Sequence, residues 1–539
     1  MRALGLWIAA AALVVAGGSY YGLVIWPQQR FQAGLDQWVE KLPPGYAAHY
    51  ENAHYSIWSG HATLSGFALH GVLPGAAPQD FDIAIDDIEL SKPALDFSAS
   101  WSQAEANPAA LTPDTALAIG DSIALRGVTL HAATMSMSLD ATQLDRPRIY
   151  PWALFQPGVP TWSEVQDVFL RQMRRAVPPP QFTEIQSLLR FEAARMLCLG
   201  YDRYTAENLK ATAQMPATPT TPAMAVSYSV RKMDGAVDRG FVKEATVEGL
   251  ALQMGPMGSF TVDRMSMADW DMRKPLNQAV SAQALNPAML DGLKLGHLEY
   301  GGMTVQMAGG TPIALGTVAL SNFVFVQSVP ISGALSWNGF HMTRAQVPNT
   351  PQAIESWNKL GLDAITVSFG LAYKWDLDGK RMTLDDTELK IDELGALKLS
   401  IELSDIVPGI AMLTQGRLVH AALRYDDASL TERALRMGAA QSGADPVALR
   451  QQWIAVLQQQ GTAPGVPPAL AAAATAFAAF LGAPHSLAIE LAPSQSVPLV
   501  TLMAARSLPP EVFLSSLGIA VSANQWSAAS FDADFLSLK

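Results

Sequence analysis

The chain contains little cysteine and few charged residues. Cys198 is the one cysteine among 539 residues, which excludes a disulfide framework and any metal site built from several thiolates. Charged residues make up 16% of the chain, against about a quarter in typical soluble domains, and the net charge is −12. Because an acidic chain lacks the basic face that neutralises phosphates, we expect no nucleic-acid partner.

The sequence also lacks the local signatures of common enzymes. It contains no nucleophile elbow, no zinc-protease helix, no phosphate-binding loop and no dinucleotide-binding fingerprint. We therefore expect a non-enzymatic protein that needs no cofactor. A hydrolase without a known motif is the less favoured alternative.

Three groups of side chains are of types that serve in catalysis or metal binding, but each fits a structural role better than a functional one. His61 and His70 lie nine residues apart on a predicted strand, so they would point to opposite faces unless the strand shifts at Gly66. Cys198 lies among apolar residues and suits a buried thiol. An acidic cluster interleaved with apolar strand positions suits a solvated face; its members are Asp385, Asp386, Glu388, Asp392 and Glu393. We therefore predict no metal site.

Apolar residues, by contrast, are abundant at 49%, and one run stands at the amino terminus. Residues 3–26 carry no charge, and as a helix they would extend about 36 Å, enough to cross a hydrocarbon core of roughly 30 Å. Aromatic residues of the kind found at membrane interfaces lie near both ends: Trp7 at one, and Tyr20, Tyr21 and Trp26 at the other. The pattern predicts a transmembrane signal anchor over residues 1–27.

A cleavable signal peptide and a buried soluble helix are the alternatives to an anchor. Ala16, Gly17 and Gly18 could serve a signal peptidase, but the apolar run is longer than the core of a signal peptide. The basic residues on the two sides do not fix the orientation. A short amino-terminal tail inside the cell would place the bulk of the chain outside. We therefore expect a single-pass protein of the bacterial inner membrane with its bulk in the periplasm.

The hydrophobic period divides the remaining chain into four regions. Strict alternation, as in Asp80 to Leu90 and Ile365 to Leu377, indicates strands, whereas a capping box at Thr161 and Glu164 opens a helical stretch. We predict an exit helix and first β region over 28–150, a helical insertion and linker over 151–224, a main antiparallel β region over 225–427, and a helical segment with C-terminal strands over 428–539. The fold class is α+β, mainly antiparallel β: one transmembrane helix, then an elongated β-rich body with two helical insertions.

A local pattern of apolar, any, Gly, apolar, any, apolar recurs along the predicted strands. A glycine there would shift the alternation of side chains by one, as a β-bulge does. Asn322, which also tolerates a positive φ, takes the glycine's place once. The predicted bulge glycines are Gly66, Gly127, Gly249, Gly302, Gly339 and Gly409. Ordinary strand glycines are the alternative interpretation.

Residues 469–481 form an almost wholly apolar segment that is too short to span a bilayer. The segment could pack as a core helix, dip into a membrane interface or meet a partner. It lacks the basic residues of an amphipathic helix that binds a membrane surface.

The amino-terminal span, the exit helix and the recurring glycine turns resemble the AsmA-like envelope proteins of Gram-negative bacteria. The later part, with Leu394-Gly395 in a strand ladder and Leu423 to Asp426 before a helix, is similar to their YdgA-like relatives. The resemblance implies a membrane-associated protein linked to lipid handling or outer-membrane assembly, and it carries no catalytic residues. We expect the protein to bind or transfer lipid along an apolar β trough; the alternative is a structural or assembly factor that binds another envelope protein.

Overall fold

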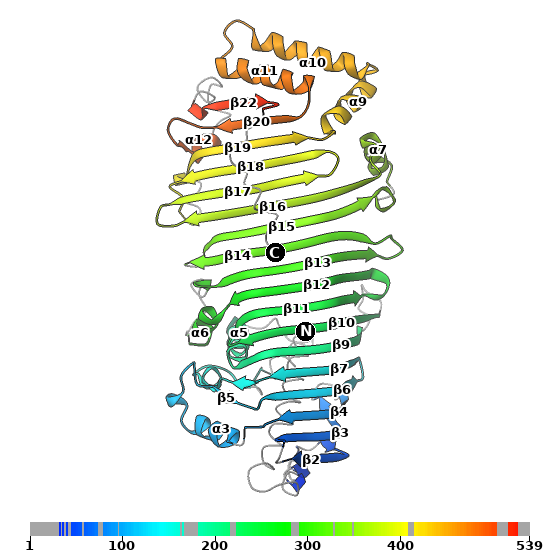
Figure 1. The fold of residues 1–539 in the computed structure, drawn as a ribbon, viewed down its shortest axis with the longest axis vertical. Helices are drawn as coiled ribbons and strands as arrows, with labels where there is room; N and C mark the ends of the chain where they lie inside the picture. The colour runs from blue at the N-terminus through cyan, green and yellow to red at the C-terminus, as the bar shows by residue number, and fades with distance from the viewer. Residues whose placement is uncertain are drawn as a thin grey trace. The chain divides into compact units, whose positions relative to one another are not determined.

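The fold of the protein is shown by a computed structural model (Figure 1). The chain splits into two compact units. Unit 1 comprises Met1–Gly310 and Ser321–Pro330, and unit 2 comprises Thr311–Leu320 and Ile331–Lys539. The structure describes residues 32–525, apart from 34, 37–38, 41, 43–44, 57–58, 74–78, 95, 162–163, 166–181, 216–222, 282–289, 327–328, 348–349, 408–413 and 504–515.

Unit 1 is built on an antiparallel sheet in which most strands pair with their neighbours in the sequence. The order is β3–β4–β6–β7–β9–β10–β11–β12–β13; β1 and β2 both pair with β3, and β5 pairs with β8. The strands are β1 (Ala47–His49), β2 (Asn52–Ser56), β3 (His61–Leu73), β4 (Gln79–Ser91), β5 (Leu117–Ala118), β6 (Ser122–Ala132), β7 (Met135–Asp145), β8 (Arg148–Ile149), β9 (Leu199–Met215), β10 (Met224–Asp238), β11 (Phe241–Gln253), β12 (Gly258–Asp271) and β13 (Lys294–Met307).

Helices occupy the connections of unit 1. They are α3 (Phe97–Ala106), α5 (Phe182–Leu197) and α6 (Arg273–Ser281), with the 3-10 turns η1 (Pro108–Ala110), η2 (Pro151–Phe155) and η3 (Gly255–Met257). α5 packs against α6 and η2 and forms a small apolar cluster that includes Ala194 and Val280. The larger core covers one face of the first strands, where Ile85, Leu139 and Val230 are each 1% exposed.

Unit 2 is built on antiparallel strands in the order β15–β16–β17–β18–β19–β20–β22, and β21 pairs with β19. The strands are β15 (Val329–Thr343), β16 (Ala364–Asp376), β17 (Arg381–Ile391), β18 (Gly395–Ser404), β19 (Arg417–Asp427), β20 (Ser486–Leu491), β21 (Val497–Pro498) and β22 (Ile519–Ala523). β14 (Ile313–Val326) contributes residues to both units.

Unit 2 carries its helices mainly between β19 and β20. They are α9 (Leu430–Ser442), α10 (Pro446–Gly461) and α11 (Pro468–Gly482), with η5 (Arg344–Gln346) and α7 (Pro351–Leu360) earlier in the chain and α12 (Leu499–Met503) later. Asp445 caps α10 by accepting hydrogen bonds from the amides of Val447 and Ala448, and Pro446 follows at the first helical position. α10 and α11 run side by side, and α11 lies next to β22 (Figure 1).

The prediction of a mainly antiparallel β fold is confirmed, whereas the prediction of an amino-terminal transmembrane helix has to be corrected. In the part of the chain that the structure describes, no helix is both long enough and apolar enough to span a membrane. The longest helices there, α5 and α10, have 16 residues each, or about 24 Å against roughly 30 Å of hydrocarbon. The single-pass inner-membrane location is therefore not supported. The predicted span, with Trp7, Tyr20, Tyr21 and Trp26, lies outside the described residues.

The predicted regions agree with the observed elements in part. The helices and strands expected over 428–539 occur as α9 to α12 and β20 to β22. The helical insertion, however, ends at Leu197, and β9 follows at once. α6 and α7 interrupt the region that was predicted as strands only. For α7 the sequence carried the signals of a helix, since Thr350 caps it, Pro351 opens it and Gly361 ends it with a φ of 62°.

Candidate functional site

One face of the sheet in unit 2 is apolar across seven strands. Side chains that are paired directly across neighbouring strands lie on the same face. Trp337 of β15 is paired with Phe369 of β16, which is paired with Leu389 of β17. The same row continues through Leu397, Tyr425 and Leu487 on β18, β19 and β20. A second row joins Leu399, Leu423, Ile489 and Val521.

The opposite face of this sheet is polar. Lys390 and Lys398 lie on it, and Lys398 is within 3.8 Å of Glu388 and 3.6 Å of Asp426. Glu388 and Asp392 belong to the acidic cluster, and Asp392 is 2.9 Å from the Lys390 ammonium group. Asp385, Asp392 and Glu393 are exposed, so the prediction of a solvated face is confirmed for them.

The apolar face of unit 2 is not buried as a protein core would be. Trp337, Leu389 and Leu397 are 37%, 40% and 39% exposed, and their apolar neighbours on β16 to β18 are half-buried. At the β20 and β22 end, α11 packs on the sheet, and its Phe480 ring lies 6.0 Å from the Tyr425 ring. Of the three possibilities left open for residues 469–481, the structure shows the packed helix, since Ala476, Ala478 and Phe480 are buried.

Unit 1 has an equivalent apolar face that is buried at one end. Leu139, Leu209 and Val230 on β7, β9 and β10 are at most 2% exposed. Farther along the same sheet, the apolar residues of β11 to β13 are mostly half-buried on the same side. They include Leu250, Leu252, Phe260, Met265, Tyr300 and Val305.

The predicted bulge glycines of unit 1 fall on one line across its sheet. Each alternate strand places a residue with positive φ on this line, and the strands between them place a charged residue there. In spatial order the line runs Glu51, Gly66, Asp86, Gly127, Asp140, Asn208, Arg231, Gly249, Asp263 and Gly302. At this line the spacing of buried residues changes from two to three, as from Ile85 to Ile88 and from Leu125 to Val128.

The glycines therefore shift the side-chain alternation, as predicted, but not by adding a residue to one strand. Ser65 pairs with Asp87 and Phe67 with Ile85, so the register is the same on both sides of Gly66. The prediction of a β-bulge is therefore wrong for Gly66, Gly127, Gly249 and Gly302. The side-chain alternation changes at the same line in every strand of the sheet, so no strand gains a residue over its neighbour. Gly339 does lie at a register shift, with a φ of 78°. Asn322 has a φ of 58°, and Gly409 lies outside the described residues.

The shift at Gly66 brings His61 and His70 to the same polar face of β3. His61 Nδ1 lies 2.8 Å from Glu89, and His70 Nδ1 lies 2.9 Å from Asp82. The two imidazoles thus contact different carboxylates. Within the described residues, no three His, Cys, Asp or Glu side chains are grouped as a metal site requires. Cys198 is 7% exposed, as predicted, and burial raises the pKa of its thiol to about 12.

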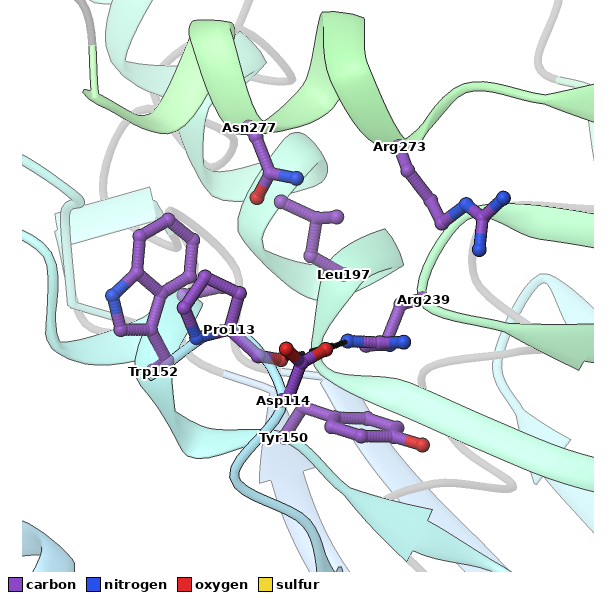
Figure 2. Close-up of a pocket in the computed structure, with 9 residues that line it drawn as sticks. Pro113, Asp114, Tyr150, Trp152, Leu197, Arg239, Arg273 and Asn277 are labelled. Atoms are coloured by element: carbon purple, nitrogen blue, oxygen red, sulfur yellow. Dashed lines mark hydrogen bonds and ion pairs between the residues drawn. The ribbon is translucent and has the colours of Figure 1, made fainter. Parts of the chain in front are cut away.

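A cavity of about 230 Å³ lies in unit 1 between the turn after β10, η2, α5 and α6. Figure 2 shows Trp152, Pro113 and Leu197 on its apolar side and Arg239, Arg273 and Asn277 around the rest. Leu197 and Trp152 belong to the apolar cluster beneath the helices. Sequence reasoning missed this cavity, because its residues come from five separate segments that share no motif.

Acidic partners fix both guanidinium groups of the cavity. Arg239 donates to the Pro113 carbonyl and to Asp114, and its guanidinium carbon stands 4.9 Å above the Tyr150 ring. Arg273 donates hydrogen bonds to both carboxylate oxygens of Asp271, at 2.9 and 2.6 Å. The hydrogen bonds from Arg273 lower the pKa of Asp271.

Two further polar groups complete the lining. The Tyr150 hydroxyl donates to Asp238 at 2.7 Å, and burial followed by this hydrogen bond raises the pKa of Tyr150. Asn277 presents its side-chain carbonyl oxygen, Oδ1, which is buried and accepts no hydrogen bond from any residue that the structure describes. The cavity therefore offers a pre-positioned set of donors and one unused acceptor.

Comparison with known proteins gives one match. A family model described as "Uncharacterized protein" matches residues 388–524, from the end of β17 through β22. No curated protein and no solved structure matches the chain. The matched segment lies wholly in unit 2 and includes the α9 to α11 insertion.

Proposed function

We propose that this protein binds the hydrocarbon chains of lipid-like molecules along the apolar face of its β-sheet, without catalysing a reaction on them. The observation that carries the proposal is the apolar face of β15 to β18, where paired rows of large side chains stay half-buried or exposed. Soluble proteins seldom leave a contiguous apolar surface of this kind uncovered without a binding role. The AsmA-like pattern of the sequence points the same way and stays a prediction.

The energetics favour a flexible chain as the occupant. Each methylene removed from water contributes about 0.8 kcal/mol. A sixteen-carbon chain with half of its surface covered would gain roughly 6 kcal/mol before the cost of ordering it. Leu389 and Leu397, directly paired across β17 and β18, lie in the middle of the row and would contact such a chain.

The alternative is an assembly factor that docks through an edge strand or through residues 469–481, and the second of these routes has less support. That segment is α11, and it packs against α10, β20 and β22. Its buried side chains are therefore not free to meet a partner without breaking unit 2 apart.

The test uses the full chain and a pyrene-labelled hexadecanoate as the probe. We expect saturable binding that unlabelled hexadecanoate displaces, and at least about tenfold weaker binding by the double variant Leu389→Glu, Leu397→Glu. Charged groups there would lie under the hydrocarbon chain without disturbing a buried core, since both leucines are already well exposed.

Val447→Glu is the matched control, because it replaces an apolar side chain that is 62% exposed on α10, away from the sheet. It should bind the probe like the unsubstituted protein. The proposal fails if the full chain does not bind the probe, or if the double variant keeps its circular dichroism spectrum and binds the probe with unchanged affinity.

A further inference from the structure

The cavity of unit 1 contains a hydrogen-bond acceptor without a donor among the described residues. Asn277 Oδ1, on α6, is buried and accepts no hydrogen bond from them. Buried polar atoms in native proteins are nearly always satisfied, and one left unpaired in a cavity is a reason to look for a ligand donor. Figure 2 shows the Asn277 amide directed towards Leu197, on the cavity side of α6.

The donors around Asn277 are rigid. Asp271 holds the Nε and Nη2 atoms of Arg273, and the Nη1 atom of Arg239 bonds to Pro113 and Asp114. Fixed guanidinium groups of this kind present their remaining N–H bonds at set positions and lose little freedom when a ligand accepts from them. The cavity thus offers donors at one side and the Asn277 acceptor at another.

The local charge disfavours an anionic ligand. Arg239 and Arg273 are outnumbered by the carboxylates of Asp114, Asp238 and Asp271, which contact them or lie within 3.5 Å. An added carboxylate or phosphate would meet guanidinium groups whose charge is already compensated. A neutral group that both donates and accepts hydrogen bonds fits these partners better, and a hydroxyl is the simplest such group.

We propose that this cavity binds a small neutral polyhydroxyl molecule of about the size of one sugar ring. One hydroxyl donates to Asn277 Oδ1, a second accepts from Arg273 or Arg239, and the C–H face of the ring packs against Trp152 and Leu197. The volume of about 230 Å³ lies below the roughly 300 Å³ at which ordinary ligand pockets begin, so a longer oligomer does not fit inside. This inference goes beyond the hydrocarbon-binding proposal and does not depend on it.

Calorimetric titration of the full chain with glucose, N-acetylglucosamine and glucuronate tests the proposal. We expect one of the two neutral sugars to bind with a dissociation constant below about 10 mM, and glucuronate, which adds a carboxylate, to bind more weakly than glucose. Tighter binding of glucuronate than of either neutral sugar would overturn the chemical class. No saturable binding of any of the three would overturn the site.

Asn277→Leu removes the acceptor at nearly constant volume. It should weaken sugar binding by about tenfold or more, because the ligand donor then loses its partner. Asn358→Leu, the same change at an exposed helical asparagine of α7, is the matched control and should leave binding unchanged.

Thermal unfolding separates a binding role of Asn277 from a structural one. Since Oδ1 accepts no hydrogen bond from the described residues, Asn277→Leu should not lower the melting temperature. A variant that melts well below the unsubstituted protein, or that binds sugar with unchanged affinity, would show that Asn277 is not a ligand-binding residue.

Discussion

The line of left-handed residues across unit 1 predicts a specific cost for replacing one glycine. Gly127 on β6 has a φ of 60°, and a Cβ atom added to it would overlap the carboxylate of Asp86 on the neighbouring strand. A residue other than glycine in the left-handed region costs about 1–2 kcal/mol. Steric overlap adds about 1 kcal/mol, the low end of the range, because the Asp86 side chain is exposed and can turn away.

Two matched variants separate these contributions. Gly309 also belongs to unit 1 and has a φ of 68°, but a Cβ atom added there meets nothing within 4 Å. Gly309→Ala should therefore cost only the backbone part, about 1–2 kcal/mol. Gly127→Ala should cost about 2–3 kcal/mol, and Gly127→Ala combined with Asp86→Ala should return to about the Gly309→Ala value, measured against Asp86→Ala alone.

Urea unfolding of the full chain, followed by circular dichroism, gives the three free-energy differences from the transition of unit 1. The slope with urea should not change, since none of the variants alters the surface exposed on unfolding. If Gly127→Ala costs no more than Gly309→Ala, the overlap with Asp86 has no energetic weight. If Gly127→Ala is neutral, β6 does not have the left-handed conformation that underlies the shift in alternation.

Three further outcomes follow from single groups. Cys198 should react with dithionitrobenzoate at pH 8 only after unfolding. Burial raises the pKa of its thiol to about 12 in the folded protein, against about 8.5 in the unfolded chain. The stabilising contribution of the buried thiol should therefore be lost as the pH rises from about 8.5 towards 12. The pKa of Asp271 is lowered, so Asp271→Asn should destabilise unit 1 by under about 1 kcal/mol at pH 7. Acid titration should show that this difference in stability vanishes as the pH falls below about 4. Asp445→Ala should cost unit 2 about 1 kcal/mol in urea unfolding through the lost cap of α10, and Asp445→Asn should restore most of it.

Alternation of apolar and polar residues was enough to predict most strands, because one face of a strand must be shielded from water along its whole length. It also detected the glycine positions, since the apolar spacing changes at each of them. It missed Asn208, the member of the same line on β9, which has a φ of 55°. Asn208 lies between Ala206 and Leu209, and alanine was not counted as apolar in the pattern although Ala206 is 1% exposed.

The sequence could not reveal that these residues form one line. A glycine in one strand and an aspartate in the next share no local pattern, and only strand register brings Gly127 opposite Asp86. The coordinated shift keeps the apolar residues of every strand on the same face. A shift in one strand alone would turn half of its apolar side chains to the polar face.

The amino-acid sequence by itself determined the antiparallel β class, the helices α9 to α11 and the burial of Cys198, because each depends on local periodicity or on flanking apolar residues. Tertiary structure alone decided which apolar face stays exposed and which side chains meet in the cavity of unit 1. Asn277, Arg239 and Trp152 are far apart in the chain, and their meeting depends on how β10, η2 and α6 pack. The exposure of a side chain and its distance from others depend on tertiary packing, and the hydrophobic periodicity of a sequence carries no information about that packing.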